Sequence, residues 1–323
     1  MTNPGSLLNF MNLRRLPGAA GEALSGIAGA SSPATWDPSV LLVFATALGT
    51  QLPLYQLFVK DRKECLTGTD MPKHVHSQVD LRLISGAALF GAGWALAGFC
   101  PGPALSSAFA GAPNAAIFVG ATIIGMTLFA LSEQGWNIKS WLDKGRSFGL
   151  HLSLAKLAAL SAGLFAFRKY ATPIESVTAV KLPTDAFPPL TNALAGGALI
   201  GLSGFLFTLA LGKVMGLSGM ISHQLNPHAN QRDRFERWFF LLGLGASALT
   251  MRYVNPAAFI SSAPSPQLWK ILLSGLMVGF GTASSNGCTS GHGLSGISRF
   301  ALRSIIATAT FFGTNVLVST FLL

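Results

Sequence analysis

The stretch SSNGCTSGHGLSG, residues 284–296, concentrates the most reactive side chains of this sequence. It holds Cys288 and, four positions later, His292, among five serine or threonine residues and four glycines. A thiol donates a weak S–H hydrogen bond and takes part in sulfur exchange, while hydroxyl and backbone N–H groups donate to anions. These residue types together indicate a site for a ligand that itself contains sulfur.

The polar neighbours of Cys288 allow more than one role. His292 could orient a substrate, neutralise its charge or lower the pKa of the thiol, and it could equally cap a broken helix. The same two roles, anion donor or helix cap, are open for Ser285, Asn286, Thr289 and Ser290.

The cysteine lies in a pattern that occurs twice. The segments GAGWALAGFC (91–100) and GFGTASSNGC (279–288) both read G-x-G-x6-C, and a helix-breaking cluster follows each one, PGPAL and TSGHGL. Cys100 therefore matches Cys288, and we expect Gly102 and Gly291 to line the substrate path beside them. The residues expected to break or pack the helices are Gly91, Gly93, Pro101, Pro103, Gly279, Gly281, Gly287 and Gly293.

The composition indicates what must position these motifs. Half of the 323 residues are hydrophobic, 11% are charged and the mean hydropathy is +0.50. A soluble domain carries about a quarter charged residues, and several apolar runs reach the roughly 20 residues that a membrane span needs. We therefore expect an all-α integral membrane protein, a multi-span bundle of two pseudo-symmetric, inverted halves, each with one helix broken near the membrane centre.

The expected organisation follows from the apolar runs. We predict a polar or interfacial lead-in (1–37), a first membrane half with GFCPGP (38–170), a Pro- and Thr-rich linker (171–191) and a second half with GCTSGHG (192–323). The predicted spans are 39–59, 83–110, 114–132, 151–168, 192–212, 237–253, 268–300 and 302 to the C-terminus, with 83–110 and 268–300 broken. Most Lys and Arg residues fall in loops 60–82, 133–150 and 213–238, which are therefore predicted to be cytoplasmic.

The distribution of charged residues, cysteines and histidines indicates which partners and ligands are not expected. The net charge of +10 comes from bases scattered singly through loops, so we expect no nucleic-acid partner. Three cysteines without a C-x2-C pair indicate neither a disulfide framework nor zinc, and we expect no metal and no cofactor. Cys65 lies in a charged loop that we expect to be exposed, and the loop histidines are predicted to be solvated: His74, His76, His223 and His228.

Two broken helices in matching places favour transport. Transporters hold substrate between discontinuous helices of inverted repeats, and the N-termini of half-helices favour anions. Two plainer interpretations stay open: small residues are common at ordinary helix contacts in membranes, and a buried cysteine can be a small apolar residue.

The segments GAALFGAGWALAGFCPGPAL and GFGTASSNGCTSGHGLSGISRF resemble the YeeE/YedE sulphur-transport family, the thiosulfate permeases. The resemblance covers residues 36–132 and 192–320, in the order of two half-proteins fused into one chain. It implies an all-helical protein, pinched towards the middle, that passes thiosulfate by S–H contacts with Cys100 and Cys288. A further cysteine of the family pattern has no counterpart in ALSGIAGASSP, residues 23–33.

The sequence therefore predicts a permease, not an enzyme, for thiosulfate or a similar small sulfur-containing anion. A sulfurtransferase or persulfide relay that uses Cys288 and His292 is the alternative. No ATP-binding P-loop occurs, so transport would be passive or coupled to another gradient. We expect the lipid bilayer as surroundings, the plasma membrane as location with an organelle membrane as alternative, and a cytosolic sulfur-accepting protein as candidate partner.

Overall fold

The computed structural model describes residues 11–12, 38–71, 78–133, 189–225, 230–254 and 266–322. The prediction of an all-helical protein is confirmed for this part of the chain, where strand pairing is limited to one isolated bridge between Glu64 and Asp70. In chain order, the helices are α3 (Ser39–Phe58), α4 (Leu81–Ala97), α5 (Pro101–Phe109), α6 (Pro113–Glu133), α9 (Pro189–Leu211), α10 (Leu217–Leu225), α11 (Gln231–Val254), α12 (Leu268–Ser285), η3 (Thr289–Gly296) and α13 (Leu302–Phe321).

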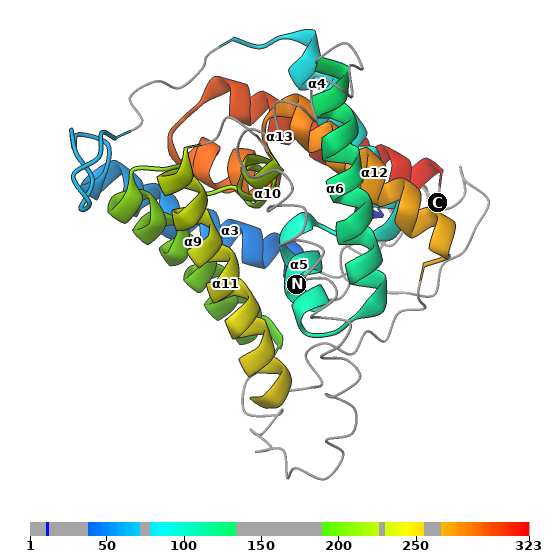
Figure 1. Cartoon of the computed structure of the whole chain (residues 1–323), viewed down its shortest axis with the longest axis horizontal. Helices are drawn as coiled ribbons and strands as arrows, with labels where there is room; N and C mark the ends of the chain where they lie inside the picture. The colour runs from blue at the N-terminus through cyan, green and yellow to red at the C-terminus, as the bar shows by residue number, and fades with distance from the viewer. Residues whose placement is uncertain are drawn as a thin grey trace, which may run out of the picture.

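Four of these helices, α3, α6, α9 and α13, are long and apolar enough to cross a membrane, and the bent pair α4–α5 makes a fifth candidate span. The predicted span 151–168, nearly all of the lead-in 1–37 and residues 171–188 of the predicted linker lie outside the described residues. The second half begins in the structure with α9, at Pro189. Figure 1 shows the short helices α5 and α10 in the middle of the bundle.

Both predicted broken helices are broken where expected. Each first arm ends at a residue in the left-handed conformation, Gly98 (φ 69°) after α4 and Asn286 (φ 60°) after α12. Glycine adopts this conformation without steric cost and asparagine tolerates it, which is why such residues end helices. Two residues later the chain is extended at Cys100 and Cys288, and a short second arm begins, with a bend of 44° between α4 and α5.

The first glycine of each G-x-G pair lets the backbone of another helix come close. A Cβ added at Gly91 would lie 2.3 Å from the carbonyl oxygen of Phe311 in α13. A Cβ added at Gly279 would lie 2.0 Å from the carbonyl oxygen of Thr122 in α6. Each broken helix therefore packs, at the same motif position, on the helix that follows the other break.

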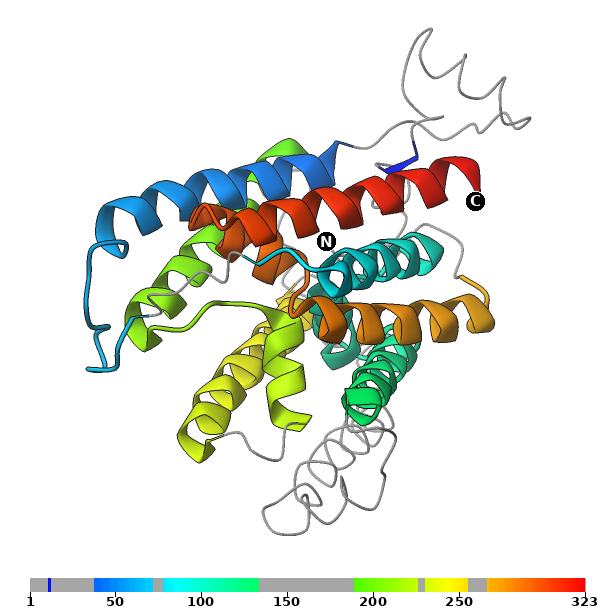
Figure 2. The ribbon, with the colours of Figure 1, turned by 90° about the horizontal axis from the view of Figure 1, so that it is seen from above.

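The second glycine of each pair joins the two broken helices to each other. A Cβ at Gly93 would lie 3.0 Å from the carbonyl oxygen of Ser274 in α12, and one at Gly281 would lie 2.6 Å from that of Gly86 in α4. Figure 2 shows α4 and α12 side by side. The second glycine of α4 thus lies against α12, and the equivalent glycine of α12 lies against α4.

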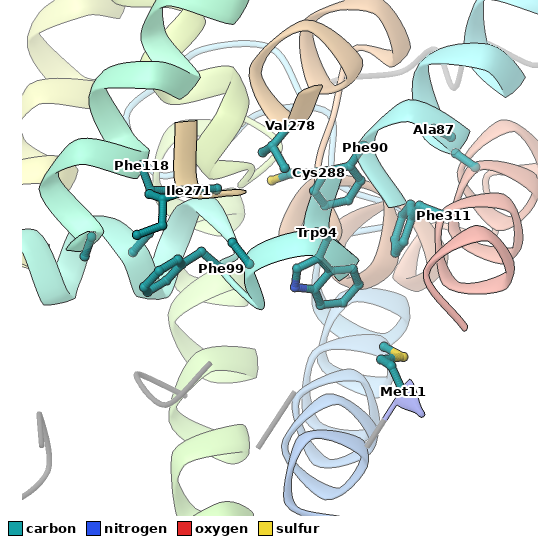
Figure 3. Close-up of a cluster of buried hydrophobic side chains, with 14 of the residues drawn as sticks. Met11, Ala87, Phe90, Trp94, Phe99, Phe118, Ile271, Val278, Cys288 and Phe311 are labelled. Carbon is teal, nitrogen blue, oxygen red and sulfur yellow. The ribbon is translucent and has the colours of Figure 1, made fainter. Parts of the chain in front are cut away.

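An aromatic core surrounds this contact. Phe90 and Trp94 of α4 stack with ring centroids 5.7 Å apart, and Phe311 of α13 meets the edges of both rings. Cys288 is part of the same buried cluster (Figure 3), and Cys100 packs against that cluster. The second break is therefore held inside the largest cluster of buried hydrophobic residues in the described chain.

Three predictions about loops are wrong. Residues 213–238 are not one polar loop, because α10 occupies Leu217–Leu225 and α11 begins at Gln231. His223 lies in α10, half-buried, with its Nε2 atom 3.8 Å from Asp233 Oδ2, so it is not simply solvated. Cys65 is buried, since the chain around it hydrogen-bonds to the end of α9 through Leu66 N to Leu209 O.

Candidate functional site at the helix breaks

The two cysteines precede the two short arms, and their hydroxyl partners come from the same helix. Cys100 is half-buried, and its Sγ atom lies 3.0 Å from Thr289 Oγ1. Cys288 is 1% exposed, and its Sγ atom lies 3.2 Å from Ser290 Oγ. Because Thr289 and Ser290 are consecutive residues of η3, the fold brings both thiols, far apart in the sequence, to one site.

The two short arms differ in the donors that they offer. α5 begins with Pro101 and has Pro103 in its first turn, and neither residue has a backbone N–H. η3 is a π-helix over TSGHGLSG, a rare form that occurs often at functional sites. Gly102 lies against α10, because a Cβ added there would be 2.7 Å from Leu217 Cδ1.

A third short helix reaches the site. The first two amides of α10 point at it: Leu217 N donates to Ser290 Oγ at 3.2 Å, and Ser218 N donates to Cys288 Sγ at 3.5 Å. Neither this helix nor either of these two residues was predicted from the sequence. The tetrapeptide G-L-S-G occurs at 216–219 and inside η3 at 293–296, but it also occurs at 201–204 in α9, so it is a weak signal for this site.

The loop before α10 is fixed against η3. A Cβ added at Gly216 would lie 3.1 Å from Gly291 Cα, so the two backbones are nearly in contact. Ser295 Oγ donates to the carbonyl of Met215 at 2.8 Å, and Gln51 Nε2 of α3 donates to Ser295 Oγ at 3.2 Å. The N-terminus of α10 is therefore positioned by η3 and α3 together.

His292 has both ring nitrogens engaged away from the cysteine. Nε2 lies 3.1 Å from the carbonyl oxygen of Ser285, and Nδ1 lies 3.0 Å from Ser304 Oγ. A carbonyl only accepts, so Nε2 carries the hydrogen, and in the neutral ring Nδ1 accepts from Ser304. The backbone N–H of His292 donates to the Cys288 carbonyl at 2.8 Å, but within the described part of the chain no hydrogen bond joins the imidazole to the Cys288 thiol. The contact with the Ser285 carbonyl, at the end of α12, is what a helix-capping role requires. A role of His292 toward substrate stays a prediction.

The other predicted site residues lie around the break. Ser285 Oγ donates to the carbonyl of Gly281 at 2.8 Å, and Asn286 is exposed at the left-handed turn. Gly287 makes room for the imidazole of His292, and Gly293 makes room for the ring of Phe44 in α3. Among the described residues, no group of His, Cys, Asp and Glu side chains is arranged to hold a metal ion.

An ion cluster lies near the base of α10. Lys213, in the segment before α10, contacts two carboxylates of α11: Asp233, at 2.5 Å, and Glu236. The hydrogen bond from Lys213 and its positive charge lower the pKa of the Asp233 carboxyl group despite its partial burial. The segment that carries α10 is thus tied to α11 on one side and to η3 on the other.

Comparisons with known proteins relate the chain to membrane transport. The family described as "Family of unknown function (DUF6691)" matches residues 27–141. A "Probable transporter" of Xylella fastidiosa (strain 9a5c) is 36% identical over 129 residues, which are 40% of this chain and 92% of that protein. A "Probable transporter" of Xylella fastidiosa (strain Temecula1 / ATCC 700964) is 33% identical over 130 residues, 40% of this chain and 74% of that protein. With the candidate spans, these similarities indicate an integral multi-pass membrane protein.

Proposed function

The chain belongs to the DUF6691 family, and we propose that it is a transporter for thiosulfate or a similar small sulfur-containing anion. The name of its Xylella relatives supports transport in general. The substrate class rests on the site and on the resemblance of its motifs to the thiosulfate permeases.

One observation carries the proposal: two thiols from two broken helices lie at one site, each with a hydroxyl partner. Cys100 and Cys288 contact Thr289 and Ser290, at 3.0 and 3.2 Å. Ordinary oxyanions are bound well by amides and cations alone, whereas a thiol offers a soft, weak S–H donor that suits a sulfur atom. A pair of cysteines at equivalent positions therefore favours an anion that contains sulfur.

The proposed path runs through the breaks. The anion enters between the halves, its charge is met by half-helix amides and hydroxyl groups, and its sulfur passes Cys100 and Cys288 by S–H contacts. The exchanged contacts of Gly91 and Gly279 support two inverted halves that rock around this fixed site. The plasma membrane remains our proposed location, and a cytosolic sulfur-accepting protein our proposed partner.

The test is uptake of thiosulfate, labelled at its outer sulfur, into liposomes that hold the purified protein. We expect the wild type to take up the label and both Cys100→Ser and Cys288→Ser to lose most of that uptake. Cys65→Ser is the matched control, because Cys65 lies in the loop beside the end of α9, and it should keep wild-type uptake.

Two other results would change the proposal. Equal uptake by all four proteins would keep transport and remove the cysteines from the path. No uptake by a correctly inserted wild type would exclude thiosulfate as the substrate.

A further inference from the structure

The N-terminus of α10 has donors that its present partners satisfy only weakly. Ser218 N donates to Cys288 Sγ at 3.5 Å, and the sulfur of a thiol is a poor acceptor. Leu217 N donates to Ser290 Oγ, a neutral hydroxyl, at 3.2 Å. An anion would accept from the same amides more strongly, because charge-assisted hydrogen bonds are about twice as strong as neutral ones.

A second observation points to a ligand at the same place. The Ser218 side chain is 2% exposed, and its Oγ atom has no hydrogen-bond partner among the described residues. A buried hydroxyl without a partner is costly, so it calls for an explanation. Only a few covalent bonds separate this hydroxyl from the Ser218 amide that points at Cys288, so it lies close to the thiol.

The helix is also held in place for binding. Gly216 lies against Gly291, and Ser295 binds the Met215 carbonyl, so the residues just before α10 cannot move independently of η3. Donors that are fixed before the ligand arrives lose little freedom on binding. With nine residues, α10 is long enough to have a helix dipole that favours an anion at this end.

We propose that the N-terminus of α10 is a third wall of the anion site, where the Leu217 and Ser218 amides and the Ser218 hydroxyl hold oxygen atoms of a small sulfur oxyanion beside Cys288. This inference rests on the proposed function and adds the residues that recognise the oxyanion end of the substrate. The cysteines then face the sulfur, and α10 faces the oxygens.

The test is equilibrium binding of labelled thiosulfate to the full-length protein in lipid nanodiscs, measured beside liposome uptake. Ser218→Ala should weaken binding about tenfold, the value expected for one hydrogen bond to a charged group. Ser222→Ala is the matched control on the same helix, because its hydroxyl bonds to the carbonyl of Gly219 within α10. It should bind as the wild type does.

A second pair of variants tests the backbone amide. Leu217→Pro removes the N–H at the first position of α10, where proline is well tolerated and where α5 itself has Pro101. Leu217→Ala removes the same side chain but keeps the amide. We expect the proline variant to bind thiosulfate roughly tenfold more weakly than the alanine variant.

The two measurements separate the inference from the proposed function. If wild type binds thiosulfate without transporting it, and Ser218→Ala weakens that binding, the site stands and the transport function fails. If wild type transports thiosulfate and Ser218→Ala binds it as tightly as Ser222→Ala, the transport function stands and the inference is wrong. An absence of thiosulfate binding by the wild type overturns both.

Discussion

At the first break, Gly98 ends α4 and Cys100 begins α5, while at the second break Asn286 ends α12 and Cys288 begins η3. In both, the last residue is left-handed and the cysteine is extended, and the glycines upstream make exchanged contacts. The backbone geometry of the two breaks is therefore nearly the same.

Their polar partners are not the same. The first break continues into Pro101 and Pro103, which have no N–H to offer. The second continues into Thr289 and Ser290, whose hydroxyl groups contact both thiols. The two copies of the repeat thus share the backbone geometry that positions the cysteine. Only the second copy supplies the hydroxyl groups that contact the thiols.

The largest expected effect tests the shared geometry. Gly91→Ala and Gly279→Ala should each destabilise the protein by about 1–3 kcal/mol or more, because the added methyl group would overlap a backbone carbonyl that cannot easily move. Thermal unfolding in detergent, followed by loss of the monodisperse peak in size-exclusion chromatography, would measure this. Similar losses in the two variants would support equivalent roles.

The helices against which Gly91 and Gly279 pack, α13 and α6, offer matched controls. A Cβ added at Gly120 in α6 or at Gly313 in α13 would meet no atom within 4 Å, so alanine there should not lower the unfolding temperature and should raise it slightly, because alanine is the better helix former. A harmless Gly91→Ala beside a damaging Gly279→Ala would contradict the equivalence of the two breaks.

The breaks could be predicted because their signals are local. The pattern G-x-G-x6-C, followed by a proline or glycine cluster, indicates where a helix stops. Because the pattern occurs twice, it predicts a helix break more specifically than a single occurrence would. The apolar runs predicted α3, α6, α9 and α13 with similar bounds for the same reason, since a membrane span is long and its composition distinctive.

The third wall could not be predicted in this way. α10 is short and has polar residues such as His223 and Gln224, so isolated it would be only marginally stable, and it depends on the burial of Met220 and Ile221. The contact between Cys100 and Thr289 joins residues 189 positions apart, and no spacing rule connects them. The sequence does contain G-L-S-G at 216–219 and at 293–296, but a third copy at 201–204 in α9 means that the repeat alone could not have predicted the contact between Gly216 and Gly291.

A smaller effect tests the difference between the breaks. Thr289→Val should slow alkylation of Cys100 by iodoacetamide about tenfold and leave Cys288 unchanged, because a thiolate loses a hydroxyl donor. Ser290→Ala should slow Cys288 and leave Cys100 unchanged. Peptide mass spectrometry of the protein after timed exposure would give the rate at each cysteine.

Thr310→Val is the control for these variants, since its hydroxyl donates to the Ile306 carbonyl within α13, at 2.8 Å. It should alter neither rate. If either η3 variant slowed both cysteines equally, the hydroxyls would act through the shape of η3 and not through separate thiols.

The smallest expected effect concerns the charges outside the site, where the second half has a cluster and the first has an exposed pair. Asp233→Asn should lower stability at pH 7 by about 1 kcal/mol or less, because Asp233 is partly exposed and screened by solvent. Its pKa is lowered from the ordinary value of 3.8 by Lys213, so the stabilisation is present above that pH and is lost as the pH falls through the lower, folded-state pKa. The unfolding temperatures of wild type and variant, recorded from pH 7 to pH 3, should therefore converge at the acidic end.

The comparison variant is Glu133→Gln, which breaks the ion pair between Arg82 and Glu133. The side chains of Arg82 and Glu133 are 43% and 49% exposed, so the variant should have a smaller effect at pH 7. An equal effect of the two variants would mean that the Lys213 cluster does not hold the segment before α10 any more firmly than an ordinary surface ion pair would.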